Sequence, residues 1–179
     1  MQIAQSVGGW LRRKATKGFT RIYHSPVESI NKRDLEDGKS IEIYWFSSDS
    51  QLFGQATPFG TIILNRNLVE GLSEETQELV FQHELGHLRR RSELRGLFWG
   101  IVFMGVLGIL SAIWFALLLA MGASLGELIE LGVFSIFSIA SFVVTNRLEE
   151  TAADLHALRE IGESDFLEGY KEVNSVTED

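Results

Sequence analysis

The chain has 179 residues, no cysteine and a formal net charge of −8, from 16 basic and 24 acidic residues. This length is typical of one compact domain with a buried core. Without cysteine, the chain has no disulfide, no cysteine-bound zinc and no thiol nucleophile. The acidic balance excludes a general nucleic-acid-binding protein, which needs a concentrated basic surface.

Residues 1–26 form a basic amino-terminal segment, with five bases and no acid. Apolar residues recur there at helical spacing before a run of bases: Ile3, Val7, Trp10 and Leu11, then Arg12 to Lys14. One interpretation is a short amphipathic helix on an anionic membrane surface. The other is a frayed leader, because Gly8 and Gly9 lie within so short a helix.

The next segments predict short elements of both kinds. Pro26 to Asp37 is interpreted as a short helix, which Gly38 would end. Ser40 to Phe46 is rich in β-branched and aromatic residues and predicts a strand, and Thr61 to Leu64 predicts a second strand after a turn.

Two further helices are predicted on either side of a long apolar region. Ser73 is a good N-cap, with two acids in the first turn, and its helix should run to about Arg91. Asn146 to Ile161 predicts the second helix, which Gly162 closes. Residues 163–179 are acidic and fit either a helix or a loose tail.

The apolar region between these helices predicts a transmembrane hairpin over 97–145. Leu97 to Gly122 holds 26 uncharged residues, enough for a helix of about 39 Å across a hydrocarbon core of about 30 Å. Leu131 to Thr145 is a shorter run of 15 uncharged residues. Arginines flank both outer ends, which predicts that these ends are cytoplasmic. A buried helical hairpin in a soluble protein is the alternative.

The segment His83-Glu84-Leu85-Gly86-His87 carries the clearest chemical pattern. Residues four apart on a helix share one face, so His83 and His87 can present two imidazoles to one zinc ion. Glu84 stands beside that face, where its carboxylate can take a proton from an activated water. The motif arises by chance in about one such sequence in a hundred, and its place in a capped helix favours a metal site over a pair of surface histidines.

A third ligand is expected from the segment Glu149-Glu150-Thr151-Ala152-Ala153-Asp154. Glu150 and Asp154 are again four apart, so one carboxylate can bind the metal while the other holds a histidine ring by a hydrogen bond. A hairpin over 97–145 would return this helix beside the histidine helix, because antiparallel neighbours pack about 8–10 Å apart.

HELGH, an intervening apolar hairpin and ETAAD together resemble the HtpX and CAAX prenyl endopeptidase group of membrane zinc metallopeptidases, within the gluzincins. Residues 56–91 also resemble that group's strand and active-site helix, and the similarity extends over about Ser40 to Ile161. The resemblance implies one zinc ion per chain and hydrolysis of peptide bonds. It implies His83, His87 and Glu150 as ligands, Glu84 as general base, Asp154 as support for a ligand, and Thr61, Ile62, Ile63 and Leu64 as an edge strand that pairs with substrate.

The sequence departs from the family pattern at several points. The family often has Asn-Ala-x-Ala before its edge strand, where this chain has Phe53-Gly54-Gln55-Ala56. Larger relatives carry additional amino-terminal membrane helices, so a minimal architecture is expected here. The sequence assigns no residue to stabilise the oxyanion, for which His156, Arg159 and Tyr170 are only candidates. His156 lies six residues after Glu150, about 240° round the helix, so it is not expected to be a ligand.

The sequence therefore predicts an α+β fold, with a small antiparallel sheet packed on a histidine helix and a glutamate helix. Residues 26–96 and 146–179 would form a cytoplasmic catalytic domain, 97–145 the membrane hairpin, and 1–25 a basic appendage. The expected function is a membrane-anchored zinc endopeptidase with protein or peptide substrates and no nucleic-acid partner. The alternatives are a latent or non-proteolytic module, whose tail or amino terminus covers the site, and a two-span scaffold without metal.

Overall fold

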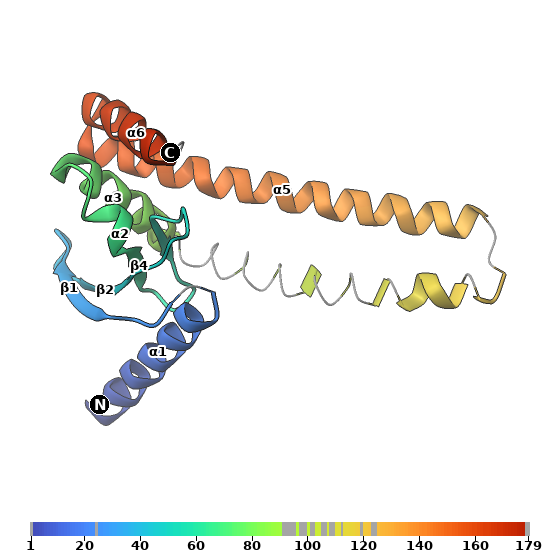
Figure 1. Cartoon of the computed structure of the whole chain (residues 1–179). Coiled ribbons are helices and arrows are strands. Elements are labelled where there is room, and N and C mark those ends of the chain that lie inside the picture. The colour runs from blue at the N-terminus through green and yellow to red at the C-terminus, as the bar shows by residue number, and fades with distance from the viewer. Residues whose placement is uncertain are drawn as a thin grey trace. The chain divides into compact units, whose positions relative to one another are not determined.

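The computed structural model describes residues 2–23, 25–90 and 125–177, together with residue 96 and scattered positions of 100–122. The chain divides into two compact units, one formed by Met1–Arg91 with Ala152–Asp179 and the other by Ser92–Thr151. The elements, labelled in Figure 1, are α1 (Gln2–Tyr23), β1 (Ser29–Asp34), β2 (Ser40–Phe46), β3 (Gly54–Ala56), β4 (Ile62–Asn65), α2 (Arg66–Val69), α3 (Glu74–Arg89), α5 (Leu125–Ile161) and α6 (Glu163–Thr177).

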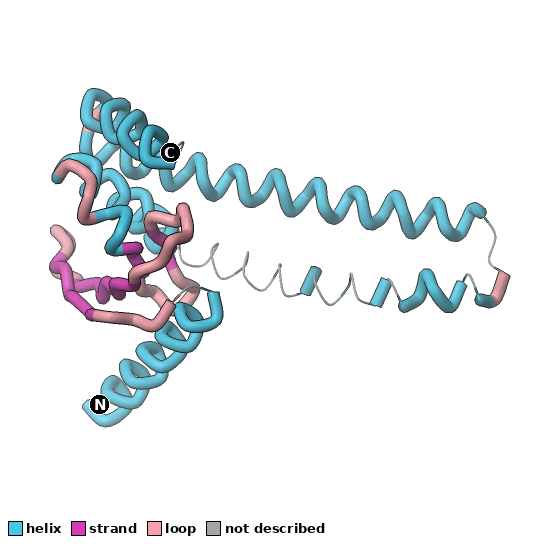
Figure 2. Tube along the Cα trace, viewed as in Figure 1, coloured by secondary structure: helices cyan, strands magenta, loops and turns pink. Residues whose placement is uncertain are grey.

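The first unit is built around a four-stranded mixed sheet with the strand order β1-β2-β4-β3. The pairs β1–β2 and β3–β4 are antiparallel, whereas β2 and β4 are parallel. The prediction of an antiparallel sheet is therefore wrong at the central pair. After β2 the chain crosses to the far edge, forms β3, and returns as β4 in the direction of β2; Figure 2 shows the strands and loops of this path.

The predicted helix over Pro26 to Asp37 is also wrong, because Ser29–Asp34 is strand β1. Its partner is β2, and the turn between them has Gly38 at a φ of 75°. Asp-Gly is a strong hairpin-turn signal because glycine adopts positive φ without steric cost. Most of β1 is exposed, so its many polar residues suit an edge strand as well as they suit a helix.

The two faces of the sheet are covered by different helices. One face packs against α3, and its buried cluster includes Ile41, Ile43, Ile62, Leu64, Val80, Phe81 and Leu85. The other face buries Tyr44, Phe46 and Ile63, with Phe19 of α1 packed against them. Figure 1 shows α1 and α3 on opposite sides of the sheet. Strand β2 is therefore almost continuously buried rather than alternating.

The helix boundaries follow the predicted signals closely at α3. The Ser73 side chain accepts a hydrogen bond from the backbone N–H of Thr76, which confirms the predicted N-cap. The acidic segment after Gly162 is the helix α6, so the helical alternative is confirmed. The amino-terminal segment is also helical, and α1 is longer than the predicted short amphipathic helix.

The first predicted span, 97–122, is described only in part, with residues 113–118 helical. The second apolar run, Leu131 to Thr145, is contained in α5. Among the residues that the structure describes, no helix is long and apolar enough to cross a membrane.

Candidate metal centre

Helix α3 positions the two predicted histidine ligands one turn apart. The ring centroids of His83 and His87 are 5.0 Å apart, with the ring planes at 80° to each other. His87 is buried, while His83 is partly exposed. Leu79, Phe81 and Leu85 are buried on the same helix, so apolar packing fixes the helix that presents both imidazoles.

Helix α5 brings the predicted acidic residues to this pair. Asp154 Oδ1 lies 2.8 Å from His83 Nδ1. Because Nδ1 is engaged in this hydrogen bond, Nε2 is the His83 nitrogen left to bind an ion. His83, His87 and Glu150 each offer a ligand atom, and these atoms lie within 4.8 Å of one another.

The grouped donors fit a zinc ion. Imidazole nitrogen and carboxylate oxygen are the zinc ligands open to a protein without cysteine. Around a tetrahedral ion with bonds of about 2.1 Å, ligand atoms stand about 3.4 Å apart, and the three atoms here lie within 4.8 Å of one another. The three side chains can thus hold one ion after small side-chain movements, and three protein ligands leave a position open for water.

Gly86 allows α3 and α5 to approach closely beside these residues. A Cβ added at Gly86 would lie 2.9 Å from Ala153 Cα and 3.1 Å from Ala153 O. Real Cβ atoms essentially never come so close to a backbone atom, and Ala153 is itself almost completely buried. Small residues at both positions therefore let Asp154 reach His83.

Glu84, the predicted general base, is buried beneath β3. Its side chain is 7% exposed, and a Cβ added at Gly54 would lie 3.2 Å from Glu84 Cγ and 2.7 Å from Leu64 Cδ2. A larger residue at Gly54 would require Leu64 and Glu84 to shift, so the glycine lets the strand pass close over Glu84. The sequence contained the glycine, but its role depends on the pairing of β3, which no local pattern indicated.

The prediction that Thr61 to Leu64 forms an edge strand is wrong, because the sheet order places this segment inside the sheet. Thr61, Ile62, Ile63 and Leu64 lie at or within β4, an inner strand that β2 and β3 pair on its two sides. An inner strand has no unpaired backbone edge left for a substrate. The edge strand beside Glu84 is β3, which lies within the four residues Phe53 to Ala56 where the sequence departs from the family pattern.

The hydrogen bonds of the β3–β4 pair show which backbone groups of β3 point outward. Phe53 O accepts a bond from Asn65 N, and Thr57 N donates to Thr61 O. Hydrogen-bonded and outward-facing residues alternate along an antiparallel strand. The N–H and C=O groups of Gly54 and Ala56 therefore face away from β4.

His156 lies close to the centre but outside the ligand group. Its Nδ1 is 3.7 Å from Glu160 Oε1, in keeping with the spacing that made it an unsuitable ligand. Burial, and then the nearby charge of Arg89, lower the pKa of His156 below its usual value. The other oxyanion candidates, Arg159 and Tyr170, are exposed.

Comparison with known families gives a match that covers most of the chain. The model of the family described as Peptidase family M48 matches residues 25–172. The match contains the histidine helix, β3, Glu150 and Asp154. No curated protein and no solved structure matches. The chain therefore belongs to peptidase family M48, and this membership implies zinc-dependent metallopeptidase activity.

Proposed function

We propose that this member of peptidase family M48 is a membrane-anchored zinc endopeptidase, with His83, His87 and Glu150 as the ligands of one ion. The observation that carries the proposal is the convergence of three ligand atoms within 4.8 Å. These residues come from segments more than 60 positions apart, and Asp154 engages the histidine nitrogen that zinc would not use. A chance pair of surface histidines has no need of such a partner.

Zinc held there would lower the pKa of a water molecule and polarise the carbonyl of the peptide bond. Glu84 would accept the proton of the attacking water and deliver it to the leaving amine as the C–N bond breaks. Asp154 keeps a hydrogen on His83 Nδ1, which fixes the ring orientation. The burial of Glu84 under β3 supports this role, because few rotamers remain open to its carboxylate.

The outward edge of β3 is proposed as the site that pairs with the substrate backbone. Edge strands bind extended peptides by adding a strand, and backbone bonds give affinity without requiring one side-chain sequence. Gly54 and Ala56 point their backbone groups outward on the strand that covers Glu84. This arrangement suits endopeptidase action on unfolded or membrane-associated protein segments.

Membrane anchoring rests on the sequence. The uncharged run 97–122, the second run 131–145 and the flanking arginines support a hairpin with both outer ends on the cytoplasmic side. The test is resistance of the full chain to alkaline carbonate extraction from membranes. Release by carbonate without detergent would contradict the anchor.

The contacts of α6 support a structural role for the acidic tail. A Cβ added at Gly169 would lie 2.8 Å from Leu79 Cδ2, so α6 packs tightly on α3. The Glu172 carboxylate accepts hydrogen bonds from the N–H and hydroxyl of Ser73 at the start of α3. Removal of the tail is therefore expected to destabilise the active-site helix rather than to activate a latent enzyme.

The decisive experiment measures zinc and cleavage on the same purified full chain. We expect one zinc per chain, cleavage of an unfolded protein substrate, and a loss of about 10²–10⁴-fold in rate for Glu84→Gln with zinc retained. Glu75→Gln is the matched control, because Glu75 lies exposed on the same helix. A chain without stoichiometric zinc, or full activity of Glu84→Gln, would refute the proposed mechanism.

A second experiment addresses the edge strand and leaves the protein unchanged. Peptide substrates carrying a single N-methyl group at successive amides remove one backbone donor at a time. If β3 pairs with the substrate, methylation at a paired amide should lower kcat/KM by about 3–10-fold, the usual value of one hydrogen bond. Equal cleavage at every methylated position would argue against strand pairing.

A further inference from the structure

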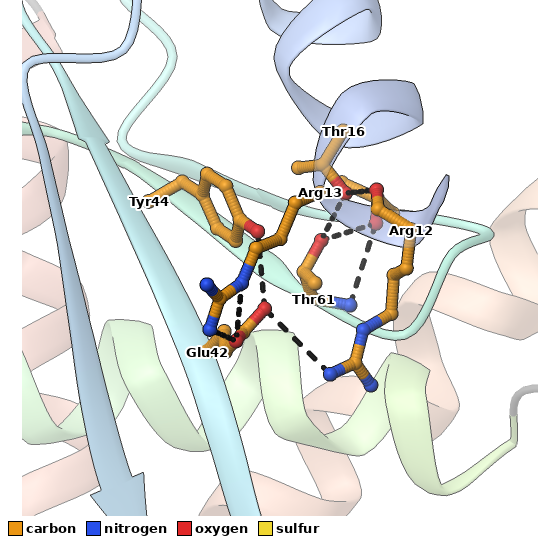
Figure 3. A network of polar contacts seen from close by, with 7 residues as sticks. Arg12, Arg13, Thr16, Glu42, Tyr44 and Thr61 are labelled. Carbon is orange, nitrogen blue, oxygen red and sulfur yellow. Dashed lines mark hydrogen bonds and ion pairs between the residues drawn. The ribbon is translucent and has the colours of Figure 1, made fainter. Parts of the chain in front are cut away.

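Helix α1 is attached to the sheet along one side by a polar network, shown in Figure 3. Arg13 donates to Glu42 through Nε at 3.0 Å and through a second nitrogen at 2.6 Å. The hydroxyl of Thr16 lies 3.1 Å from that of Thr61. Thr16 and Thr20 are completely buried, so this side of α1 faces the protein.

The other side of α1 carries an exposed basic stripe. Successive helical residues turn by about 100°, which places Trp10, Lys14, Lys17 and Arg21 within a narrow arc roughly opposite Phe19. These four residues are called the basic stripe below. All four are exposed, and Trp10 is 55% exposed. Leu11, beside Trp10, is 54% exposed.

The charges of the basic stripe are unbalanced. Arg13 forms an ion pair with Glu42, and a nitrogen of Arg12 lies 3.6 Å from the same carboxylate. Among the described residues, no acid pairs with Lys14, Lys17 or Arg21, and α1 itself contains no acid. The ammonium of Lys14 lies 4.3 Å from the centroid of the Trp10 ring, so the cation and the aromatic ring form one surface.

We propose that the basic stripe lies on an anionic lipid surface and holds the first unit against the bilayer. Bases beside phospholipid headgroups are attracted to them, and tryptophan favours the boundary between headgroups and acyl chains. Exposed Trp10 and Leu11 beside three bases suit that boundary better than they suit a wholly polar acidic protein. The inference rests on the proposed membrane location, and it is independent of zinc and of peptide hydrolysis.

The network of Figure 3 determines what such binding would achieve. Because Arg13 and Thr16 join α1 to β2 and to the start of β4, a helix held on the membrane also holds the sheet. The same sheet carries β3 beside Glu84. A membrane-bound α1 would therefore keep the substrate-pairing edge at a fixed height over the lipid surface, where membrane-associated segments are presented.

The test uses the absence of cysteine in the chain. Gly18→Cys introduces a single thiol on α1, at a position with no atom within 4 Å of an added Cβ. An environment-sensitive fluorophore on this thiol reports insertion at the interface. The labelled full chain is placed in nanodiscs of phosphatidylcholine alone or of phosphatidylcholine with phosphatidylglycerol.

We expect a brighter, blue-shifted emission only with the anionic lipid, reversed when salt rises from about 50 to about 500 mM. Each base near such a surface gives roughly a fivefold gain in partitioning, so Lys14→Glu, Lys17→Glu and Arg21→Glu together should cost at least about 100-fold. The matched control is Lys32→Glu with Lys171→Glu, two exposed bases on β1 and α6. The control should leave the emission unchanged.

Three results would overturn the proposal. Equal emission in both lipids would exclude recognition of anionic lipid, and insensitivity to the triple reversal would exclude the basic stripe. A change that depends on protein concentration in phosphatidylcholine alone would assign the stripe to a second copy and its acidic residues. Zinc content and cleavage, measured on the same samples, separate these results from a failure of the proposed enzyme activity.

Discussion

Helices α3 and α1 lie on opposite faces of one sheet, but different chemistry holds each of them in place. Helix α3 is fixed by apolar burial, with Leu79, Phe81 and Leu85 almost fully enclosed. Helix α1 packs the ring of Phe19 against the sheet, and polar contacts run from Arg13 to Glu42 and from Thr16 to Thr61.

The two kinds of attachment suit the proposed roles of the helices, a metal site on α3 and a lipid-binding surface on α1. Apolar packing does not depend on protonation, so it holds a metal site in a constant geometry. A polar attachment depends on the charge of Glu42, which is 4% exposed. Burial alone would raise the pKa of Glu42, but the hydrogen bonds from Arg13 and Tyr44 outweigh it and lower the pKa. The α1 contact is therefore the more sensitive of the two to pH.

The largest expected effect comes from the apolar side. Phe81→Ala should reduce the free energy of unfolding by about 3–5 kcal/mol, because it leaves a cavity in the packed face. Leu11→Ala on α1 is the matched control and should change stability by less than about 0.5 kcal/mol, since Leu11 is half exposed. Thermal unfolding in detergent measures both. A small loss for Phe81→Ala would mean that α3 is held by something other than this core.

A glycine-to-alanine substitution should lower the stability of the protein in α3 and raise it in α1. Gly86→Ala forces a Cβ against the backbone of Ala153 and should cost about 1–3 kcal/mol, as overpacking does. It should also weaken zinc binding, because α5 must move away. Gly18→Ala has open space around it and should stabilise α1 by up to about 1 kcal/mol through helix propensity. The same sign for both would contradict the close approach at Gly86.

Removing the charge of Glu42 should loosen α1 alone. Glu42→Gln weakens the bonds from Arg13 and Tyr44, at a cost of about 1–2 kcal/mol after allowance for the exposure of Arg13. Hydrogen exchange should become faster in residues of α1 and stay unchanged in α3. Lys39→Gln, which removes an exposed ion pair in the β1–β2 turn, is the control.

The polar network of Glu42 contributes to stability only over a limited range of pH. The lowered pKa of Glu42 means that its contribution is present above the unfolded pKa and is lost as pH falls through the folded value. Burial and the bond to Glu42 raise the pKa of Tyr44 to about 12. Its contribution is present below the unfolded value and is lost as pH rises through about 12. Protection of α1 against exchange, relative to the unfolded chain at the same pH, should therefore be greatest between these limits. A protection that does not change with pH would contradict the role of the network.

The sequence predicted the elements whose signals are local. The Ser73 cap, the histidines four apart, and the spacing of Glu150 and Asp154 follow from helical periodicity, which needs no knowledge of the rest of the chain. The structure brings the ligand atoms of His83, His87 and Glu150 together, with Asp154 on His83. Their grouping could be anticipated because short-range geometry had already set each half of the site.

The sequence did not predict what long-range pairing decides. Strand β3 has only three residues, one of them a glycine, so no periodic pattern marks it. Its position at the edge of the sheet depends on β4 lying between β2 and β3. Strand β1 is mostly exposed and largely polar, and its polar pattern fitted a helix. Its Asp37-Gly38 turn was the usable signal that the helix interpretation overlooked.

The smallest expected effect lies at the start of α3 and sharpens the comparison with α1. The Glu172 carboxylate accepts bonds from Ser73, through its N–H and its hydroxyl, and a short one from Thr76. The bonds from Ser73, and then that from Thr76, lower the pKa of Glu172. Its contribution is present above the unfolded pKa and is lost as pH falls through the folded value. Glu172→Gln should cost less than about 1 kcal/mol, as the loss of one partly exposed cap interaction does.

Acid thus protonates one carboxylate at each helix, Glu42 at α1 and Glu172 at α3, but the consequences should differ. At α3 only the first turn should exchange faster, because the apolar core still holds Leu79 to Leu85, whereas α1 should open along its described length. Glu168→Gln, an exposed acid on the same helix as Glu172, serves as the control and should leave α3 unchanged. If exchange throughout α3 rose in acid as much as in α1, polar contacts would be holding both helices, and the distinction between the two faces would fail.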